Sequence, residues 1–302
     1  MILLTGGLGM IGAHTARALV DLGEQVVITA HRATDIPSFL VDRVAVERVD
    51  LTDRESVLRL GDRHEIRDIV HLAGSVPTGP TLPFFRHDLG ALLTMLEAAR
   101  AWGVRRFAVA SSVSVYSGRT ESALTEDLPL PSVRSPHAIV AFKKAVEPLV
   151  QYELDGSDVS PVILRIGSTW GPLMDPESPF NPVPRTVGAL LRGEAVDVQE
   201  PGDGDVGYAP DIGRAIALLA AARHLSHHTY NVASGTRFIG NELAEALREG
   251  FPDGHIRFTG GDPDNGPRMD LSRLVADTGF RAQFDIRSAV ADYVAWRSRN
   301  RR

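Results

Sequence analysis

A glycine-rich stretch close to the start of the chain has the residue types needed to bind the phosphates of a nucleotide. The run from Thr5 to Gly12 follows a short apolar segment and opens a segment with helical spacing. Gly6 and Gly9 would let the backbone turn tightly and approach a pyrophosphate. The first helical amides, those of Met10 and Ile11 among them, would offer N–H groups to the phosphates. The stretch therefore predicts a dinucleotide site, and the alternative is a tight strand-to-helix turn without a ligand.

Two segments further along the chain, around residues 31–32 and 50–51, bear on the choice of cofactor. The acidic residue that would bind the ribose 2′-hydroxyl is absent where the second strand ends on His31 and Arg32. These two side chains could pair with a 2′-phosphate, which favours NADP over NAD. The alternative is that Arg32 stacks on adenine, which leaves the choice open. Asp50, followed by Leu51, could accept a hydrogen bond from the adenine amino group or cap a helix after Thr52.

These residues need a scaffold of alternating strands and helices, and the apolar pattern supplies one. Short apolar runs read as buried parallel strands, and the segments between them place apolar residues on one helical face. This alternation predicts a doubly wound parallel sheet of the Rossmann type with a smaller carboxy-terminal substrate lobe. We expect a dinucleotide-binding domain over 1–171, and a substrate lobe over 172–302 from which some segments return to the first domain. The five predicted strands are Ile2–Leu4, Gln25–Thr29, Asp68–Leu72, Arg106–Ala110 and Val162–Ile166.

Composition excludes several classes of function. The 302 residues carry a formal net charge of -6 and no block of basic residues, so nucleic acid is not an expected partner. No apolar run reaches the roughly 18 residues of a membrane helix, and no signal peptide is recognised. With no cysteine there is no disulfide framework or thiolate metal site. His64, His227 and His228 show no ligand spacing, so no metal is expected either. We expect a cytoplasmic protein.

Several further motifs agree in order and spacing with one family. The chain resembles the extended short-chain dehydrogenase/reductases, the NAD-dependent epimerase/dehydratase group, over almost its whole length. Besides the glycine-rich stretch, the resemblance is carried by Asp50-Leu51, His71-Leu72-Ala73-Gly74, Leu96-Glu97-Ala98-Ala99-Arg100, Ser111-Ser112-Val113-Ser114-Val115-Tyr116, Lys143-Lys144-Ala145-Val146-Glu147, and Arg165 through Trp170-Gly171-Pro172.

The resemblance implies roles for several of these residues. Residues 72–74 would line the cofactor, and Ser112 would bind the reacting oxygen. Lys143 would hold the nicotinamide ribose and lower the pKa of a neighbouring group, while Ser114 would meet a substrate hydroxyl. The resemblance also implies a homodimer formed through the helices that correspond to Leu89–Arg100 and Val140–Tyr152.

One position departs from the family pattern at the centre of the expected chemistry. The family places a proton-transferring tyrosine four residues before the lysine, and counting back from Lys143 reaches Ile139. Isoleucine has no proton to give. Three substitutes are close in sequence: His137, Tyr116, and a water molecule ordered by Ser112 and Lys143.

Other departures concern the substrate. Two arginines that nucleotide-sugar members commonly use against the diphosphate are missing, at Gly204 and within 261–265, and His87 replaces an asparagine. The main hypothesis is an NADP-preferring oxidoreductase that acts on a hydroxyl or carbonyl of a small, polar, sugar-like molecule without a nucleotide. The alternatives are a sugar epimerase or dehydratase that recycles its cofactor within each turnover, and a cofactor-binding sensor or scaffold that has lost turnover.

Overall fold

The centre of the molecule is a seven-stranded parallel sheet. The computed structural model describes residues 1–31, 35–77, 79–131, 135–178, 181–199, 204–235, 237–238, 240–259 and 267–301. The strand order is β11-β7-β5-β4-β1-β2-β3, and every pairing is parallel. The predicted fold class is confirmed. The strands are β1 (Ile2–Thr5), β2 (Val26–Ala30), β3 (Ala45–Arg48), β4 (Asp68–His71), β5 (Arg106–Ser112), β7 (Ser160–Ile166) and β11 (Thr229–Val232).

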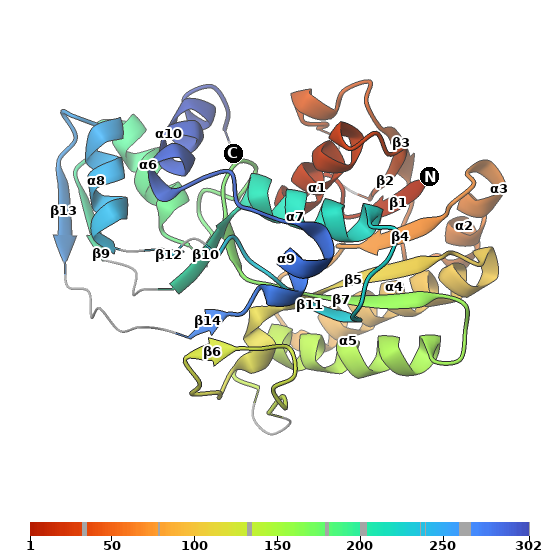
Figure 1. Ribbon diagram of the computed structural model, residues 1–302. Helices are drawn as coiled ribbons and strands as arrows, with labels where there is room; N and C mark the ends of the chain where they lie inside the picture. Colours follow the sequence, from red (N-terminus) through yellow and green to blue (C-terminus); the bar gives the residue numbers. More distant parts are fainter. Residues whose placement is uncertain are drawn as a thin grey trace.

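Helices cover both faces of this sheet (Figure 1). The side chains of β1 alternate between two cores, because successive residues of a strand point to opposite faces. Ile2 and Leu4 pack with one set of helices, and Leu3 packs with the other. The first set is α1 (Met10–Asp21), α7 (Ala209–Ala221) and α9 (Ser272–Thr278), and the second is α2 (Arg54–Leu58), α3 (Leu60–Arg63), α4 (Thr81–Trp102) and α5 (Ala138–Leu154).

A second lobe lies beside the sheet, on the left of Figure 1. Its core is built around the buried rings of Trp170, Tyr208 and Tyr293. The lobe contains α6 (Val183–Leu191), α8 (Gly240–Gly250), α10 (Ile286–Arg297) and the parallel pair β9 (Val196–Gln199) and β13 (Ile256–Thr259). The smaller sheets are formed by β8 (Ser168–Trp170), β10 (Gly204–Tyr208) and β12 (Arg237–Phe238), and by β6 (Ala123–Leu124) with β14 (Arg268–Met269).

Two segments that follow the expected boundary at residues 171–172 belong to the first lobe. Strand β11 pairs with β7 inside the central sheet. Helix α7 packs along α1 in the core on one face of that sheet. The amino-terminal half therefore draws on residues of the second half to complete its sheet and its helical layer, and the domain boundary itself stays a prediction.

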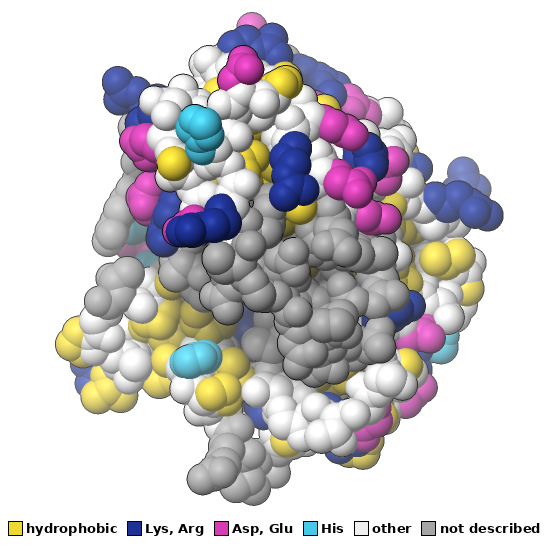
Figure 2. Space-filling model, turned by 90° about the vertical axis from the view of Figure 1, so that its left-hand side faces the viewer, with side chains coloured by type: hydrophobic (Ala, Val, Ile, Leu, Met, Phe, Trp, Pro, Cys, Tyr) yellow, Lys and Arg dark blue, Asp and Glu magenta, His cyan; other side chains and the backbone are white. Residues whose placement is uncertain are grey.

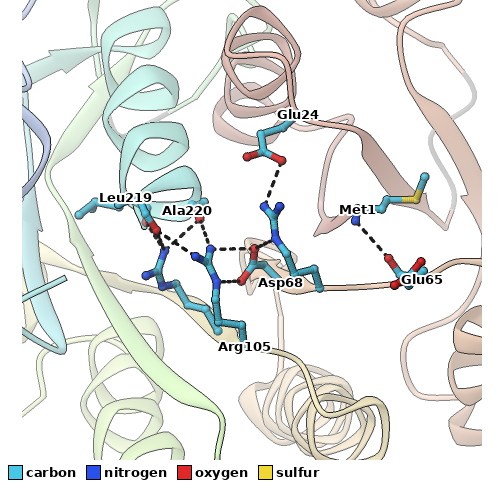
Figure 3. Close-up of polar contacts among 10 residues, drawn as sticks. Met1, Glu24, Glu65, Asp68, Arg105, Leu219 and Ala220 are labelled. Carbon is cyan, nitrogen blue, oxygen red and sulfur yellow. Dashed lines mark hydrogen bonds and ion pairs between the residues drawn. The ribbon is translucent and has the colours of Figure 1, made fainter. Parts of the chain in front are cut away.

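Charged groups tie together the amino-terminal edge of the sheet. The carboxylate of Asp68 is buried and accepts hydrogen bonds from Arg67 at 2.7 Å and Arg105 at 2.9 Å (Figure 3). Arg105 and Arg106 also donate to the carbonyl of Ala220 in the last turn of α7, at 3.3 and 3.0 Å. Cations at the carboxyl end of a helix satisfy its last carbonyls and its dipole. This network occupies one edge of the sheet, and the candidate site lies at the opposite, carboxyl-terminal edge.

The surface and the helices bear on the expected partners. On the face drawn in Figure 2, basic and acidic side chains lie interspersed among uncharged ones. Among the residues that the structure describes, none of the helices has the length and apolar character needed to cross a membrane.

Candidate functional site

The glycine-rich loop forms a tight cradle between β1 and α1. Gly6 has a φ of +71°, a conformation that glycine adopts without strain, and a Cβ there would lie 2.8 Å from the amide nitrogen of Ala73. A Cβ on Gly12 would lie 2.1 Å from the Gly6 carbonyl oxygen. Helix α1 starts after Gly9, and its first backbone bond runs from Ala13 to the Gly9 carbonyl. The amides of residues 10–12 therefore have no acceptor within the helix.

A side-chain hydrogen bond fixes the loop after β4 against this cradle. The Thr5 hydroxyl is 2.9 Å from Nδ1 of His71 and accepts from the Ala73 amide at 3.1 Å. His71 is buried, and burial, with a contribution from the charge of Lys143, lowers its pKa to about 3. The imidazole is therefore neutral at physiological pH. The backbone of Leu72 and Ala73 therefore lies against Gly6, and a contact of residues 72–74 with a cofactor stays a prediction.

Lys143 reaches from α5 to the end of β5. Its Nζ donates a hydrogen bond of 2.6 Å to the carbonyl of Ala110, two residues before Ser112. Burial lowers the pKa of Lys143 to about 8, and the charge of Asp88 opposes this shift. An ammonium group with a pKa close to the working pH can hold a charge or exchange a proton. The structure thus brings two of the predicted site residues to one strand end.

Ser112 and Ser114 lie on the turn that follows β5. Ser112 is the N-cap of the short helix η2 (Val113–Tyr116), and its Oγ accepts from the Ser114 amide at 3.1 Å. An oxygen that accepts this bond still has its own hydrogen to donate. The Ser114 Oγ is buried and has no hydrogen-bond partner within the described residues. A buried hydroxyl without a partner is rare, and a ligand could supply one.

Tyr116 takes part in a buried polar cluster. Its hydroxyl donates toward Asn231 Oδ1 at 2.8 Å and the Thr125 carbonyl at 3.1 Å, and it accepts from Arg165 at 2.8 Å. Burial raises the pKa of Tyr116. This hydroxyl is bonded on all sides to groups of the fold, which gives it a structural role in the cluster.

The same cluster ties α5 to β5 one turn beyond Lys143. Glu147 accepts from Arg165 at 2.8 Å and from the Ser111 hydroxyl at 2.5 Å. The exposed fractions of the Arg165 and Glu147 side chains are 6% and 5%. Because Ser111 stands beside Ser112 in the chain, the ion pair fixes the strand end and the helix that carries Lys143 in one geometry.

The position at which the resemblance expects a tyrosine is apolar in the structure as well. Ile139 packs, partly buried, against the core that contains Phe84 and Phe142. His137, two residues earlier, is the exposed N-cap of α5, and its side chain makes no capping hydrogen bond. Of the proposed substitutes for the tyrosine, His137 is exposed and the Tyr116 hydroxyl is engaged elsewhere. Ser112 is the last residue of β5, and Lys143 donates to the carbonyl of Ala110 two residues before it.

The residues predicted for the adenine end gather at the ends of β2 and β3. Asp50 Oδ1 accepts from the amide and hydroxyl of Thr52 at 2.9 and 2.7 Å, and Oδ2 lies 3.6 Å from His31 Nε2. The hydrogen bonds from Thr52 are the main cause of the lowered pKa of Asp50. Helix α2 is capped by Asp53, so Asp50 does not cap it. Leu51 is buried in the core. Arg32, on which the preference for NADP depended, lies outside the described residues.

Sequence reasoning missed Asp88. This aspartate stands on α4, and its carboxylate is buried. It accepts from the amide and the hydroxyl of Ser75, both at 2.8 Å, and contacts Nδ1 of His87 at 2.9 Å. Its charge also favours the protonated form of Lys143. The available signal was a carboxylate on the apolar face of a predicted helix.

The parallel sheet and the glycine cradle at its carboxyl edge define a dinucleotide-binding α/β protein. The chain belongs to the NAD dependent epimerase/dehydratase family, whose family model matches residues 2–233. The resemblance stated from the motifs is confirmed.

Individual relatives agree with the family. A dTDP-glucose 4,6-dehydratase of Actinoplanes sp. is 27% identical and the match covers 99% of this chain and 98% of the relative. The solved structure of Bordetella bronchiseptica WbmH in complex with NAD+ is 25% identical, covers 98% of this chain and 97% of that one, and has a TM-score of 0.77. MoeE5 in complex with UDP-glucuronic acid and NAD is 26% identical, covers 99% of both chains, and also has a TM-score of 0.77. The first relative is named as a sugar-nucleotide dehydratase, and the two solved structures hold NAD+ or NAD. The chain is an enzyme of the epimerase/dehydratase type.

Proposed function

We propose that this protein oxidises or reduces a hydroxyl or carbonyl group of a small, sugar-like substrate with a nicotinamide cofactor. The observation that carries the proposal is that Lys143 reaches the carboxyl end of β5, where Ser112 ends the strand. The glycine cradle lies at the same edge of the sheet, and it has no room for a side chain at Gly6 or Gly12. A Cβ at Gly6 or Gly12 would meet backbone atoms, so the close approach serves the loop geometry that a pyrophosphate requires.

The residues of the cradle fit the cofactor. Gly6, Gly9 and the amides of Met10 and Ile11 would hold the pyrophosphate, with Leu72, Ala73 and Gly74 lining the same space. When bound, the nicotinamide would accept a hydride from the substrate carbon or return one to it. Lys143 would hold the adjacent ribose. Its ammonium group lies in a largely buried setting, where its charge is screened less than in water.

We infer that the proton moves through Ser112 and a water molecule beside Lys143. Ser112 retains a hydrogen to donate, because its hydroxyl acts only as the acceptor in the bond from the Ser114 amide. The pKa of Lys143, about 8, suits a group that replenishes a proton near neutral pH. His137 stays a second candidate proton donor. Ser114, whose hydroxyl lacks a partner within the described residues, is a candidate contact for a substrate hydroxyl.

A preference for NADP(H) over NAD(H) is part of the proposal. The end of β2 offers His31 and Arg32 in place of a carboxylate, and these groups suit a 2′-phosphate. The two solved structures described above hold NAD+ or NAD. A preference for NADP would therefore distinguish this chain from them.

A second candidate function is a closed-cycle epimerase or dehydratase, which the names of the relatives favour. Against a nucleotide-linked substrate stands the lack of the two expected arginines. One of the positions concerned, 261–265, lies outside the described residues. The cytoplasmic location stays a prediction. The homodimer also stays a prediction. Two large side chains on the helices concerned are exposed, as such an interface would require: Leu93 on α4 by 50% and Tyr152 on α5 by 83%.

The proposal is tested by measuring the cofactor directly. Mass spectrometry of the denatured protein first shows whether a nucleotide co-purifies, and titrations with NADPH and NADH then follow nicotinamide fluorescence. We expect tighter binding of NADPH. Retained NAD would favour the closed cycle, and binding of neither cofactor would overturn the proposal in favour of a scaffold.

The chain offers a matched pair of variants for the catalytic part. Its only lysines are Lys143 and Lys144, and the second donates to the carbonyl of Pro131 at 2.6 Å. We expect Lys143→Met to weaken cofactor binding and lower turnover at least about tenfold, and Lys144→Met to change neither. Equal effects of the two substitutions would reject the role of Lys143. A loss of tenfold or more in His137→Ala would transfer the proton step to that histidine.

A further inference from the structure

Three side chains that can bind metal ions meet at the adenine end of the candidate cofactor site. His31, Asp50 and His87 each offer one ligand atom, and these atoms lie within 4.8 Å of one another. His31 Nε2 and Asp50 Oδ2 are 3.6 Å apart. Two ligands bound at about 2.0 Å to a tetrahedral ion are separated by roughly 3.3 Å, so small side-chain movements would complete the coordination.

A neighbouring carboxylate holds His87 in the form that a metal needs. A carboxylate oxygen of Asp88 lies 2.9 Å from Nδ1 of His87. Because a carboxylate accepts a hydrogen bond, it places the ring proton on Nδ1 and leaves the Nε2 lone pair available. Asp88 is itself buried and fixed by Ser75 through two bonds of 2.8 Å. A carboxylate behind a ligating histidine is the usual arrangement in zinc sites.

Hydrogen bonds also orient a second ligand, Asp50. Oδ1 of Asp50 is occupied by the amide and hydroxyl of Thr52, which leaves Oδ2 directed toward His31. The imidazole rings of His31 and His87 lie nearly parallel, at 13°, with their centroids 6.5 Å apart. Each of the three ligands therefore has a second contact or a facing ring that limits its rotation.

The donor set selects the kind of ion. Two imidazole nitrogens and one carboxylate suit Zn²⁺, Co²⁺ or Ni²⁺, whereas Mg²⁺ and Ca²⁺ prefer oxygen ligands alone. The exposed fractions of the three side chains, 44%, 41% and 47%, leave room for water in the remaining coordination positions. We propose that His31, Asp50 and His87 bind one divalent transition-metal ion, of which Zn²⁺ is the representative.

The site would couple metal to cofactor. Asp50 is also the residue expected to accept the adenine amino group, so a metal ion on its carboxylate would exclude that contact. Zinc would then weaken cofactor binding and act as an inhibitor. This competition rests on the proposed function, whereas the metal site itself does not. Sequence spacing indicated no metal site because the three ligands come from separate segments that only the fold brings together.

Calorimetric titration of untagged, cofactor-free protein with ZnCl₂ tests the site. We expect one ion per chain with a Kd on the order of micromolar. His31→Ala and His87→Ala should each weaken binding at least about tenfold, and Asp88→Asn by about tenfold through loss of the supporting carboxylate. His228→Ala, which removes an exposed histidine elsewhere, should leave the affinity unchanged. Because His31 and His87 are exposed, we expect their alanine variants to stay folded. The melting temperature of each variant tests this.

Two results would overturn the metal site: no binding at a ratio of one to one, or wild-type affinity in both His31→Ala and His87→Ala. The visible spectrum of the Co²⁺ complex gives a second readout of coordination. Competition is measured separately, as an increase in the Kd of NADPH on addition of zinc to wild-type protein but not to His87→Ala. Zinc binding without competition would keep the site and reject the placement of adenine on Asp50.

Discussion

The substitution Glu147→Gln should lower the stability of the fold by far more than the similar shapes of the two side chains suggest. The carboxylate accepts from Arg165 at 2.8 Å and from Ser111 at 2.5 Å, in a place where both charged side chains are almost wholly buried. Glu147→Gln keeps the shape and removes the charge, which leaves the guanidinium of Arg165 without a counter-ion. Removing one partner of a buried pair typically costs about 3–5 kcal/mol. We therefore expect the free energy of unfolding to fall by about that amount.

An exposed ion pair of similar geometry provides the control. Arg257 contacts Asp197 through two hydrogen bonds of 2.7 Å, and the two side chains are 74% and 58% exposed. Asp197→Asn should cost less than about 1 kcal/mol, because water screens such pairs. Urea unfolding followed by circular dichroism gives both values. If the two substitutions cost the same, burial does not set the strength of the Glu147 pair, and the reasoning is wrong.

Three further predictions follow from the same structure. Gly12→Ala should abolish cofactor binding or folding, because its Cβ would lie 2.1 Å from the Gly6 carbonyl oxygen; normal fluorescence titration would contradict this. Burial lowers the pKa of His71 to about 3 and of His14 to about 4. The unfolded chain therefore gains protons below pH 6.5 while the folded protein does not, so stability should decline as the pH falls from 6.5 toward 4, which denaturant unfolding at each pH measures. Tyr116→Phe should lower the free energy of unfolding by about 1–3 kcal/mol and leave kcat within about twofold, whereas a large loss of kcat at unchanged stability would return Tyr116 to the catalytic role.

The features that the sequence predicted well are those written in local patterns. The apolar runs before Gly6 and before Leu72 each made one strand, and the period of the helices between them set the layers. The glycine cradle was recognisable because its residue types are required by the backbone itself. The role of Lys143 was implied by the resemblance, which depends on a short motif of neighbouring residues. Each of these inferences depends on residues close together in the chain.

The features that could not be predicted depend on contacts between distant segments. Asn231, on β11, meets the Tyr116 hydroxyl only because β11 returns to the sheet beside β7. Asp88 reaches Ser75 and His87 through the packing of α4 on the loop after β4. In a single sequence, neither a tyrosine in a motif nor an aspartate in a helix indicates which partner it will have. Tyr116 therefore stayed among the candidate proton donors until its bonds to Arg165 and Asn231 were known.

The distribution of lysine and arginine along the chain adds to what the motif implies about Lys143. Of the 32 basic residues, only positions 143 and 144 are lysine, and the others are arginine. Arginine stays charged at any working pH, whereas a buried lysine can lose its proton. At residue 143 burial brings the pKa to about 8, with the buried carboxylate of Asp88 opposing a larger shift. A site that needed only a fixed positive charge could have used arginine, as this chain does elsewhere. The amine of Lys143, one helical turn after Ile139, therefore supports the proposal that Lys143 takes part in the proton step.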